Sequence, residues 1–245
     1  MRISANEEPN EKDEFLAEVG YPEARLCEDY ILINQDLEDA IFYAERVLAK
    51  TREIKSKRGE NYKFNSENDR RIFEADWVAA LIKYYRCFGK GVREKLDPCI
   101  FEKLQDAKKA HEYFIDLRSK HIAHSINSFE QAKVYVVLPP VRTSDPKVLD
   151  VGGFSTRRFI EVPENIENFL RLANIAKQEA YRLFAESQRQ VFEKALKEPI
   201  ENLYSRPYAS IQITGGDKAA KSNRQKPSKK RLGAAHPQGV RSRPA

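Results

Sequence analysis

An apolar stripe at helical spacing runs from Ile166 to Val191 and constrains the fold of this chain more than any other feature. Its members recur every three or four residues, as one face of an amphipathic helix requires. The stripe therefore predicts a helix of roughly 30 residues, about 45 Å long at the α-helical rise. Such a helix can span a whole bundle or bind a partner helix. The stripe comprises Ile166, Phe169, Leu170, Ala173, Ala176, Ala180, Leu183, Phe184 and Val191.

Three shorter apolar stripes predict three earlier helices, over residues 35–58, 66–88 and 97–121. The first is expected to begin after Asn34, since asparagine is a good N-cap residue and an aspartate follows in the first turn. The third is expected to begin at Asp97, because a proline occupies the next position, the first of the helix. Together with the long helix, these stripes predict a mainly α protein, built as an antiparallel four-helix bundle.

Between the third and fourth helices the pattern changes to that of β-strands. Three short segments, 134–138, 148–151 and 158–162, are rich in β-branched and aromatic residues, and Gly152-Gly153 marks a turn between the last two. We expect a small β-hairpin or a three-stranded insertion, about residues 134–162, packed beside the helices before the last long helix.

The charge of the chain is unevenly distributed. Residues 216–245 hold nine of the 43 Lys and Arg and one of the 37 Asp and Glu, a local charge of +8. The remainder carries −2, so the net charge of +6 is no evidence for a nucleic-acid-binding surface on the folded domain. We predict a partly disordered lead-in over 1–34, a helical domain over 35–205 and a disordered basic tail over 206–245.

Hydropathy and cysteine usage restrict the environment of the protein. No window approaches the roughly 18 consecutive apolar residues of a membrane span, and the N-terminus lacks the apolar stretch of a secretory signal. The three cysteines are an odd number without a CxxC spacing, which is typical of free thiols in a reducing compartment. We therefore expect a cytoplasmic protein with no membrane partner, no bound metal and no cofactor.

The third helix carries polar groups where its apolar seam should continue. His111, Arg118 and His121 occupy positions at which leucine or isoleucine would pack. Burying an unpaired guanidinium is costly, so Arg118 needs a partner or a wet cleft. His124 follows about 600° further around an ideal α-helix, which leaves it about 120° from Arg118. The two can converge on one ligand if the helix ends or distorts near Ala123, or if a second chain completes the site.

The spacing of Arg118, five residues and His124 resembles the motif of the HEPN superfamily (higher eukaryotes and prokaryotes nucleotide-binding), an arginine and a histidine separated by four to six residues. The string from Asp116 to Asn127 is similar to that of many bacterial members, and the resemblance covers roughly residues 35–200. Many members are metal-independent ribonucleases in toxin–antitoxin, abortive-infection and phage-defence systems. The resemblance implies a HEPN-like bundle that cleaves RNA, a homodimer whose two sites meet in one cleft, and an antitoxin protein as a candidate partner.

The chemistry of these side chains suits RNA cleavage. His124 would act as acid and base, because an imidazole exchanges protons near neutral pH. Arg118 would hold the phosphate oxygens and stabilise the negative charge of the transition state. Ser119 and His121 would help to position the RNA.

Two other functions remain open. Active members of the superfamily carry Asn, Asp or His after the arginine, whereas Ser119 stands here. This departure favours a non-catalytic module that binds a nucleotide, RNA or a protein. The third interpretation is a purely structural helical interaction protein. Glu74 or Asp76, on the second helix, would orient Arg118 in a functional site, or form an internal ion pair with it in the structural interpretation.

Overall fold

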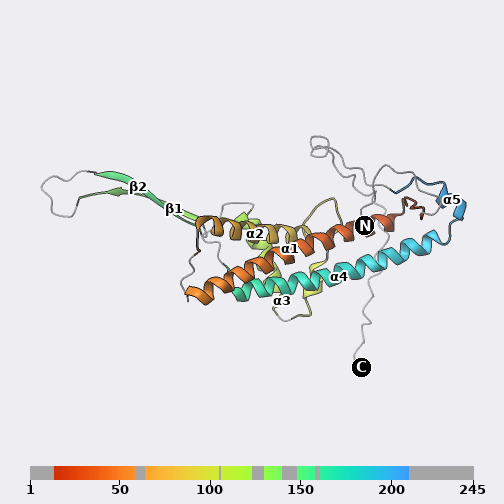
Figure 1. Cartoon of the computed structure of the whole chain (residues 1–245), viewed down its shortest axis with the longest axis horizontal. Coiled ribbons are helices and arrows are strands. Elements are labelled where there is room, and N and C mark those ends of the chain that lie inside the picture. Colours follow the sequence, from red (N-terminus) through yellow and green to blue (C-terminus); the bar gives the residue numbers. More distant parts are fainter. Residues whose placement is uncertain are drawn as a thin grey trace, which may run out of the picture.

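The computed structural model describes residues 14–58, 64–104, 106–122, 130–139, 148–157 and 161–209. The chain is mainly helical and carries one two-stranded hairpin (Figure 1). The helices are α1 (Pro22–Arg58), α2 (Glu67–Arg86), α3 (Ala107–Asp116), α4 (Pro163–Ala195) and α5 (Ile200–Tyr204); η1 (Pro98–Phe101) is a 3-10 turn, η2 (Leu117–Ile122) is π-helical, and the strands are β1 (Glu130–Val137) and β2 (Asp150–Arg157).

The long helices α1 and α4 form an antiparallel pair. Ion pairs fasten both ends of it, from Arg52 to Glu167 at one end and from Lys194 to Glu23 at the other, each at 2.6 Å. The buried positions of both helices alternate three and four residues apart, which is the spacing of a coiled-coil seam. This confirms the predicted long fourth helix. The seam of α1 consists of Ile33, Leu37, Ala40, Ala44, Val47, Thr51 and Ile54, and that of α4 of Ile166, Phe169, Ala173, Ala176 and Ala180.

Helix α2 lies antiparallel to α1, and α3 packs between α2 and α4. Ser66 caps α2 by accepting a hydrogen bond from the amide of Asp69 (3.1 Å). At the centre, the ring of Trp77 on α2 meets Phe114 on α3 and Phe169 on α4 edge-on, with centroids 6.1 and 5.2 Å away. These three buried rings join the helices into one core.

Helix α1 begins at Pro22, so the prediction that it starts after Asn34 is wrong. The proline stands at the first helical position and Glu23 follows in the first turn, both good start signals. The side-chain amide of Asn34 donates to the carbonyl of Tyr30 (2.9 Å), within the helix, and caps nothing. The helical domain therefore includes residues 22–34, which the predicted lead-in over 1–34 contained.

The predicted third helix is broken in two. Asp97 does cap a helical turn, accepting from the amide of Cys99 (2.9 Å), but that turn is the short 3-10 element η1. The continuous helix starts only after Asp106, whose backbone is left-handed with φ of 60° and cannot belong to a right-handed helix. Leu104, which lies between the two parts, is exposed.

The hairpin is two-stranded and antiparallel, with Tyr135 opposite Gly152. Residues 161–162 lead into α4 without forming a strand, so a third strand over 158–162 is not seen, and 158–160 lie outside the described residues. Figure 1 shows the hairpin projecting from the end of the bundle, so the prediction that it packs beside the helices is wrong. A Cβ atom at Gly152 would lie 2.6 Å from the Tyr135 ring, so the glycine makes room for that ring.

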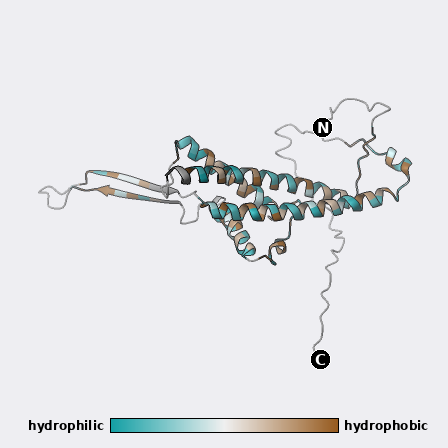
Figure 2. Cartoon of the chain, turned by 60° about the horizontal axis from the view of Figure 1, so that its bottom comes forward, coloured by the Kyte–Doolittle hydropathy of each residue, from teal (hydrophilic) through white to brown (hydrophobic). Residues whose placement is uncertain are grey.

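The two ends of the described chain meet at the far end of the bundle. The amide of Glu18 donates a hydrogen bond to the carbonyl of Pro207 (2.8 Å), and the amide of Ala209 donates one to the carbonyl of Leu16 (2.7 Å). The first residues of the predicted basic tail are thus paired with the N-terminal segment, and 210–245 lie outside the described residues. Hydrophilic and hydrophobic residues alternate along every long helix in Figure 2, and none of the described helices is long and apolar enough to cross a membrane.

Candidate functional site

Arg118 lies in the π-helical turn η2, stacked on a tyrosine of α2. Its guanidinium carbon is 4.0 Å from the centroid of the Tyr85 ring, a cation–π contact. Gly89 lies close against the same ring: a Cβ atom at Gly89 would come within 2.7 Å of the Tyr85 ring. Both stacked side chains are half-buried. The Nε atom of Arg118 is buried and has no hydrogen-bond partner among the described residues.

The two carboxylates predicted to orient Arg118 do not meet it. Glu74 accepts a hydrogen bond from Arg70 one turn earlier on α2 (2.5 Å). Asp76 pairs instead with Arg46 on α1 (3.2 Å). No ion pair to Arg118 forms within the part of the chain that the structure describes. The internal ion pair that a purely structural role would use is therefore absent among these residues.

The charge of Arg118 is consequently left without a counter-ion from the described residues. A cation–π contact contributes about 0.5–2 kcal/mol but neutralises no charge. A buried hydrogen-bond donor without an acceptor costs about 1–3 kcal/mol. A guanidinium that is half-buried, flattened on a ring and not neutralised has the chemistry of an anion-binding group, and phosphate is the anion that its fork of donors fits best.

The residues after Arg118 continue the π-helical turn. Ser119 is half-buried, and Lys120 is exposed and pairs with Asp116 at 2.7 Å. The backbone of His121 belongs to η2, while its side chain and the whole of His124 lie outside the described residues. A π-helix joins residues five apart and is enriched at functional sites. The separation of about 120° between Arg118 and His124, worked out for an ideal α-helix, does not apply to it.

His111, the first polar residue of the seam, belongs to the core. It is 4% exposed, and the centroids of Phe88 and Phe101 lie 4.6 and 4.9 Å from its ring. Its Nδ1 shares a hydrogen bond of 2.9 Å with the hydroxyl of Tyr84. Burial lowers the pKa of His111 to about 4, so the ring is neutral at pH 7. His111 fills space in the core and hydrogen-bonds the Tyr84 hydroxyl. It takes no part in the Arg118 cluster, which consists of Arg118, Tyr85 and the residues of η2.

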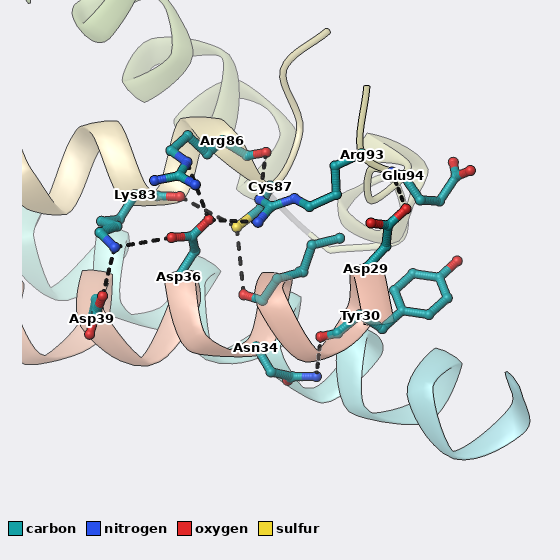
Figure 3. A network of polar contacts seen from close by, with 11 residues as sticks. Asp29, Tyr30, Asn34, Asp36, Asp39, Lys83, Arg86, Cys87, Arg93 and Glu94 are labelled. Carbon is teal, nitrogen blue, oxygen red and sulfur yellow. Dashed lines mark hydrogen bonds and ion pairs between the residues drawn. The ribbon is translucent and has the colours of Figure 1, made fainter. Parts of the chain in front are cut away.

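A second charged cluster, which the sequence did not reveal, surrounds Asp36 (Figure 3). Its carboxylate is 4% exposed and accepts from Arg93 at 2.8 Å and Lys83 at 3.1 Å, with Arg86 at 3.4 Å. In the same loop, the backbone amide of Glu94 donates a hydrogen bond to the carboxylate of Asp29 on α1 (2.9 Å). These contacts fasten the loop after α2 to α1. Because the carboxylate is saturated by cations, the Asp36 cluster is a structural feature.

Cys87 lies beside this cluster and is a structural thiol. Its Sγ donates to the carbonyl of Lys83 at 3.4 Å, and burial raises its pKa to about 12. A thiol with such a pKa is unreactive near neutral pH. Among the described residues, no group of three or more His, Cys, Asp or Glu side chains is placed to hold a metal ion.

Comparison with known proteins yields no relative: no family model, no curated protein and no solved structure matches the chain. Function is therefore inferred from Arg118 and its surroundings.

Proposed function

We propose that this chain is a metal-independent endoribonuclease of HEPN type that acts in bacterial stress response or phage defence. The observation that carries the proposal is the Arg118 guanidinium, half-buried on the Tyr85 ring with no ion pair to any described residue. The internal ion pair expected for a structural role would have paired Arg118 with a carboxylate. One that is held flat and left unpaired suits the phosphate backbone of RNA.

The proposed reaction needs only side chains and the RNA itself. The 2′-hydroxyl attacks the adjacent phosphorus, forming a new bond from the 2′-oxygen to phosphorus and breaking the bond to the 5′-oxygen. His124 takes the proton from the 2′-hydroxyl and supplies one to the departing 5′-oxygen. Arg118 binds the non-bridging oxygens and stabilises the charge that grows on them. Ser119 and His121 position the strand. The products are a 2′,3′-cyclic phosphate and a 5′-hydroxyl.

Arg118 follows a change from α-helix to π-helix at Leu117. In a straight α-helix, Arg118 and His124 would diverge. We propose that the two groups meet on one phosphate either because the helix ends after η2 or because a second copy of the chain supplies the histidine. The order of the helices, with α3 and η2 before the long α4, also suits a HEPN-like bundle.

The test is cleavage of total RNA by the purified full chain in EDTA. We expect wild type to cleave, and Arg118→Ala to lose about 100-fold or more in rate, the usual effect of removing one transition-state donor. His124→Ala should lose at least as much. Arg70→Ala is the matched control, because Arg70 is an α2 arginine paired with Glu67 and Glu74 away from the cluster. Equal cleavage by all four proteins, or cleavage by none, refutes the proposal.

Ser119 supports a second candidate, a non-catalytic module that binds RNA, a nucleotide or an antitoxin-like protein. Serine replaces the larger polar residue that active HEPN members carry after the arginine. The two candidates differ in one measurement. A binding module retains RNA on Arg118, with affinity lost in Arg118→Ala, but leaves the strand intact over any incubation time.

A further inference from the structure

The hairpin exposes apolar side chains on both of its faces. Side chains alternate between the faces of a strand, so Val134, Val136 and Val151 share one face. These three are 79%, 54% and 60% exposed. The other face carries Tyr135 and Phe154, whose ring centroids lie 6.0 Å apart. Neither face is covered by the bundle, from which the hairpin projects (Figure 1).

A ribbon of this kind is incomplete by itself. Two isolated strands are only marginally stable in water, and a third strand or a packing partner is normally required. Each strand also leaves one row of backbone donors and acceptors unpaired at its outer edge. The free edge of β1 is the better template, because β1 contains neither glycine nor proline, whereas β2 contains Gly152 and Gly153.

We propose that β1 pairs edge to edge with β1 of a second copy of this chain, antiparallel, across a two-fold axis at Tyr135. The result is a four-stranded sheet in the order β2, β1, and then the partner's β1 and β2. In this register Tyr135 lies opposite the partner's Tyr135, and Val134 lies opposite the partner's Val136. The valines of both copies form one continuous apolar face.

Charge selects this register over its neighbours. Lys133 falls opposite the partner's Val137, whose own neighbour in the hairpin is Asp150. The lysine of each copy thus lies two strands away from the partner's Asp150 on the same face, about 10 Å at the usual spacing of adjacent strands, within reach of its long side chain. Sliding the register by two residues in either direction removes this proximity, and sliding it by one turns the valines to the opposite face.

The hairpin exposes a large apolar area. Nine apolar side chains of the hairpin are at least one-third exposed, and together they present roughly 300–600 Å² of apolar surface, taking about 60–120 Å² for a whole side chain. This is at the upper limit for a monomer. Edge-to-edge pairing leaves both faces of the sheet open, so the dimer depends on backbone hydrogen bonds between the two β1 edges and on contacts between side chains of adjacent strands. Because this buries less than the roughly 800 Å² per partner of a standard interface, we expect a weak dimer.

This dimer is independent of the proposed RNA cleavage. Glu130 stands five residues before Tyr135, so at about 3.3 Å per residue the bases of the two hairpins lie about 33 Å apart. The Arg118 clusters of the two copies would therefore act separately, and the single shared cleft implied by the HEPN resemblance would need another contact between the bundles.

Disulfide trapping of the full-length protein tests the register. With Tyr135→Cys the two thiols face each other on the axis, and we expect a cross-linked dimer under mild oxidation. With Val137→Cys, the cysteine of each copy lies four positions along the strands from the cysteine of the other copy, beyond disulfide reach. We expect no cross-link in that variant. Wild type, with its exposed Cys99, gives the background. Cross-linking of Val137→Cys alone, or of neither variant above background, overturns the proposal.

The second test exchanges the charges of the hairpin and measures dimerisation by sedimentation. Lys133→Asp should weaken the dimer about tenfold, and the double variant Lys133→Asp with Asp150→Lys should restore it. A protein that stays monomeric at about 100 µM, or a dimer indifferent to both changes, overturns the proposal. So does a wild-type protein that is monomeric while its hairpin variants alter RNA or protein binding, because the occupant of the surface is then a different molecule. RNA cleavage, assayed in parallel, is unaffected if the two proposals are independent.

Discussion

The protonation of His111 predicts a specific loss of stability in mild acid. Its ring is enclosed by Phe88, Phe101 and Tyr84 and bears no charge in the folded state. Burial lowers its pKa from 6.5 to about 4. The unfolded chain therefore binds a proton at a pH where the folded protein does not. Stability from this residue is fully present above pH 6.5 and is lost progressively as the pH falls towards 4.

The magnitude follows from the two pKa values. Between pH 7.5 and pH 6 the free energy of unfolding should fall by about 0.8 kcal/mol, and between pH 7.5 and pH 5 by about 2 kcal/mol. Carboxylates interfere little in this range. The pKa values of Glu23 and Glu67 are lowered by their basic partners, so their stabilising effect is lost only below about pH 4.5.

The assay is urea unfolding followed by circular dichroism at pH 7.5, 6 and 5. His111→Gln is the control: it is less stable at every pH, because it leaves the packing and the Tyr84 hydroxyl poorly matched, but it lacks the histidine-dependent slope. If wild type and His111→Gln lose the same free energy between pH 7.5 and pH 5, His111 is not buried as a neutral ring.

Three further changes probe the core, the Asp36 cluster and the Arg118 stack. Trp77→Ala removes the ring that joins α2 to Phe114 and Phe169 and should cost about 3–5 kcal/mol of unfolding free energy, measured by denaturant titration. Asp36→Ala leaves Arg93, Lys83 and Arg86 without their shared carboxylate; we expect a loss of about 3 kcal/mol, and faster amide hydrogen exchange confined to the loop after α2. Gly89→Ala places a methyl group 2.7 Å from the Tyr85 ring and should displace it from beneath Arg118, so RNA cleavage should drop several-fold while stability falls by less than about 1 kcal/mol; unchanged cleavage would show that the stack does not position Arg118.

Periodicity in the sequence predicted the elements whose burial is uniform. The stripes of α2 and α4 could be identified because one face of each helix is apolar along most of its length. The start of α1 was missed because an asparagine before an acidic residue is an N-cap signal and is equally compatible with the middle of a helix. At Asn34 the side chain bonds back to Tyr30, and only the tertiary packing of Ile33 and Leu37 decides between the two.

The candidate site could be predicted only in part, because its contacts join residues that are distant in the sequence. The sequence correctly marked Arg118 as unusual in an apolar seam, but it suggested a carboxylate as the partner, while the structure supplies Tyr85. Helical spacing places Tyr84, and not Tyr85, on the apolar stripe of α2, but it does not predict that the Tyr85 ring meets Arg118. The hairpin shows the same limit: β1 could be predicted from its β-branched residues, whereas the predicted turn at Gly152-Gly153 is wrong, because both glycines lie within β2, paired with β1. The projection of the hairpin away from the bundle could not be predicted either.

Analysis of the RNA ends after cleavage tests the central claim most directly. A short RNA incubated with the protein in EDTA should yield 2′,3′-cyclic phosphate and 5′-hydroxyl ends by mass spectrometry, and a single 2′-deoxy substitution at the cleaved position should abolish cutting there. Arg118→Ala should yield at most about one-hundredth of the product. Ends with a 3′-hydroxyl and a 5′-phosphate, undiminished cutting at the 2′-deoxy position, or an intact RNA would contradict the assignment of Arg118 and His124 to this reaction.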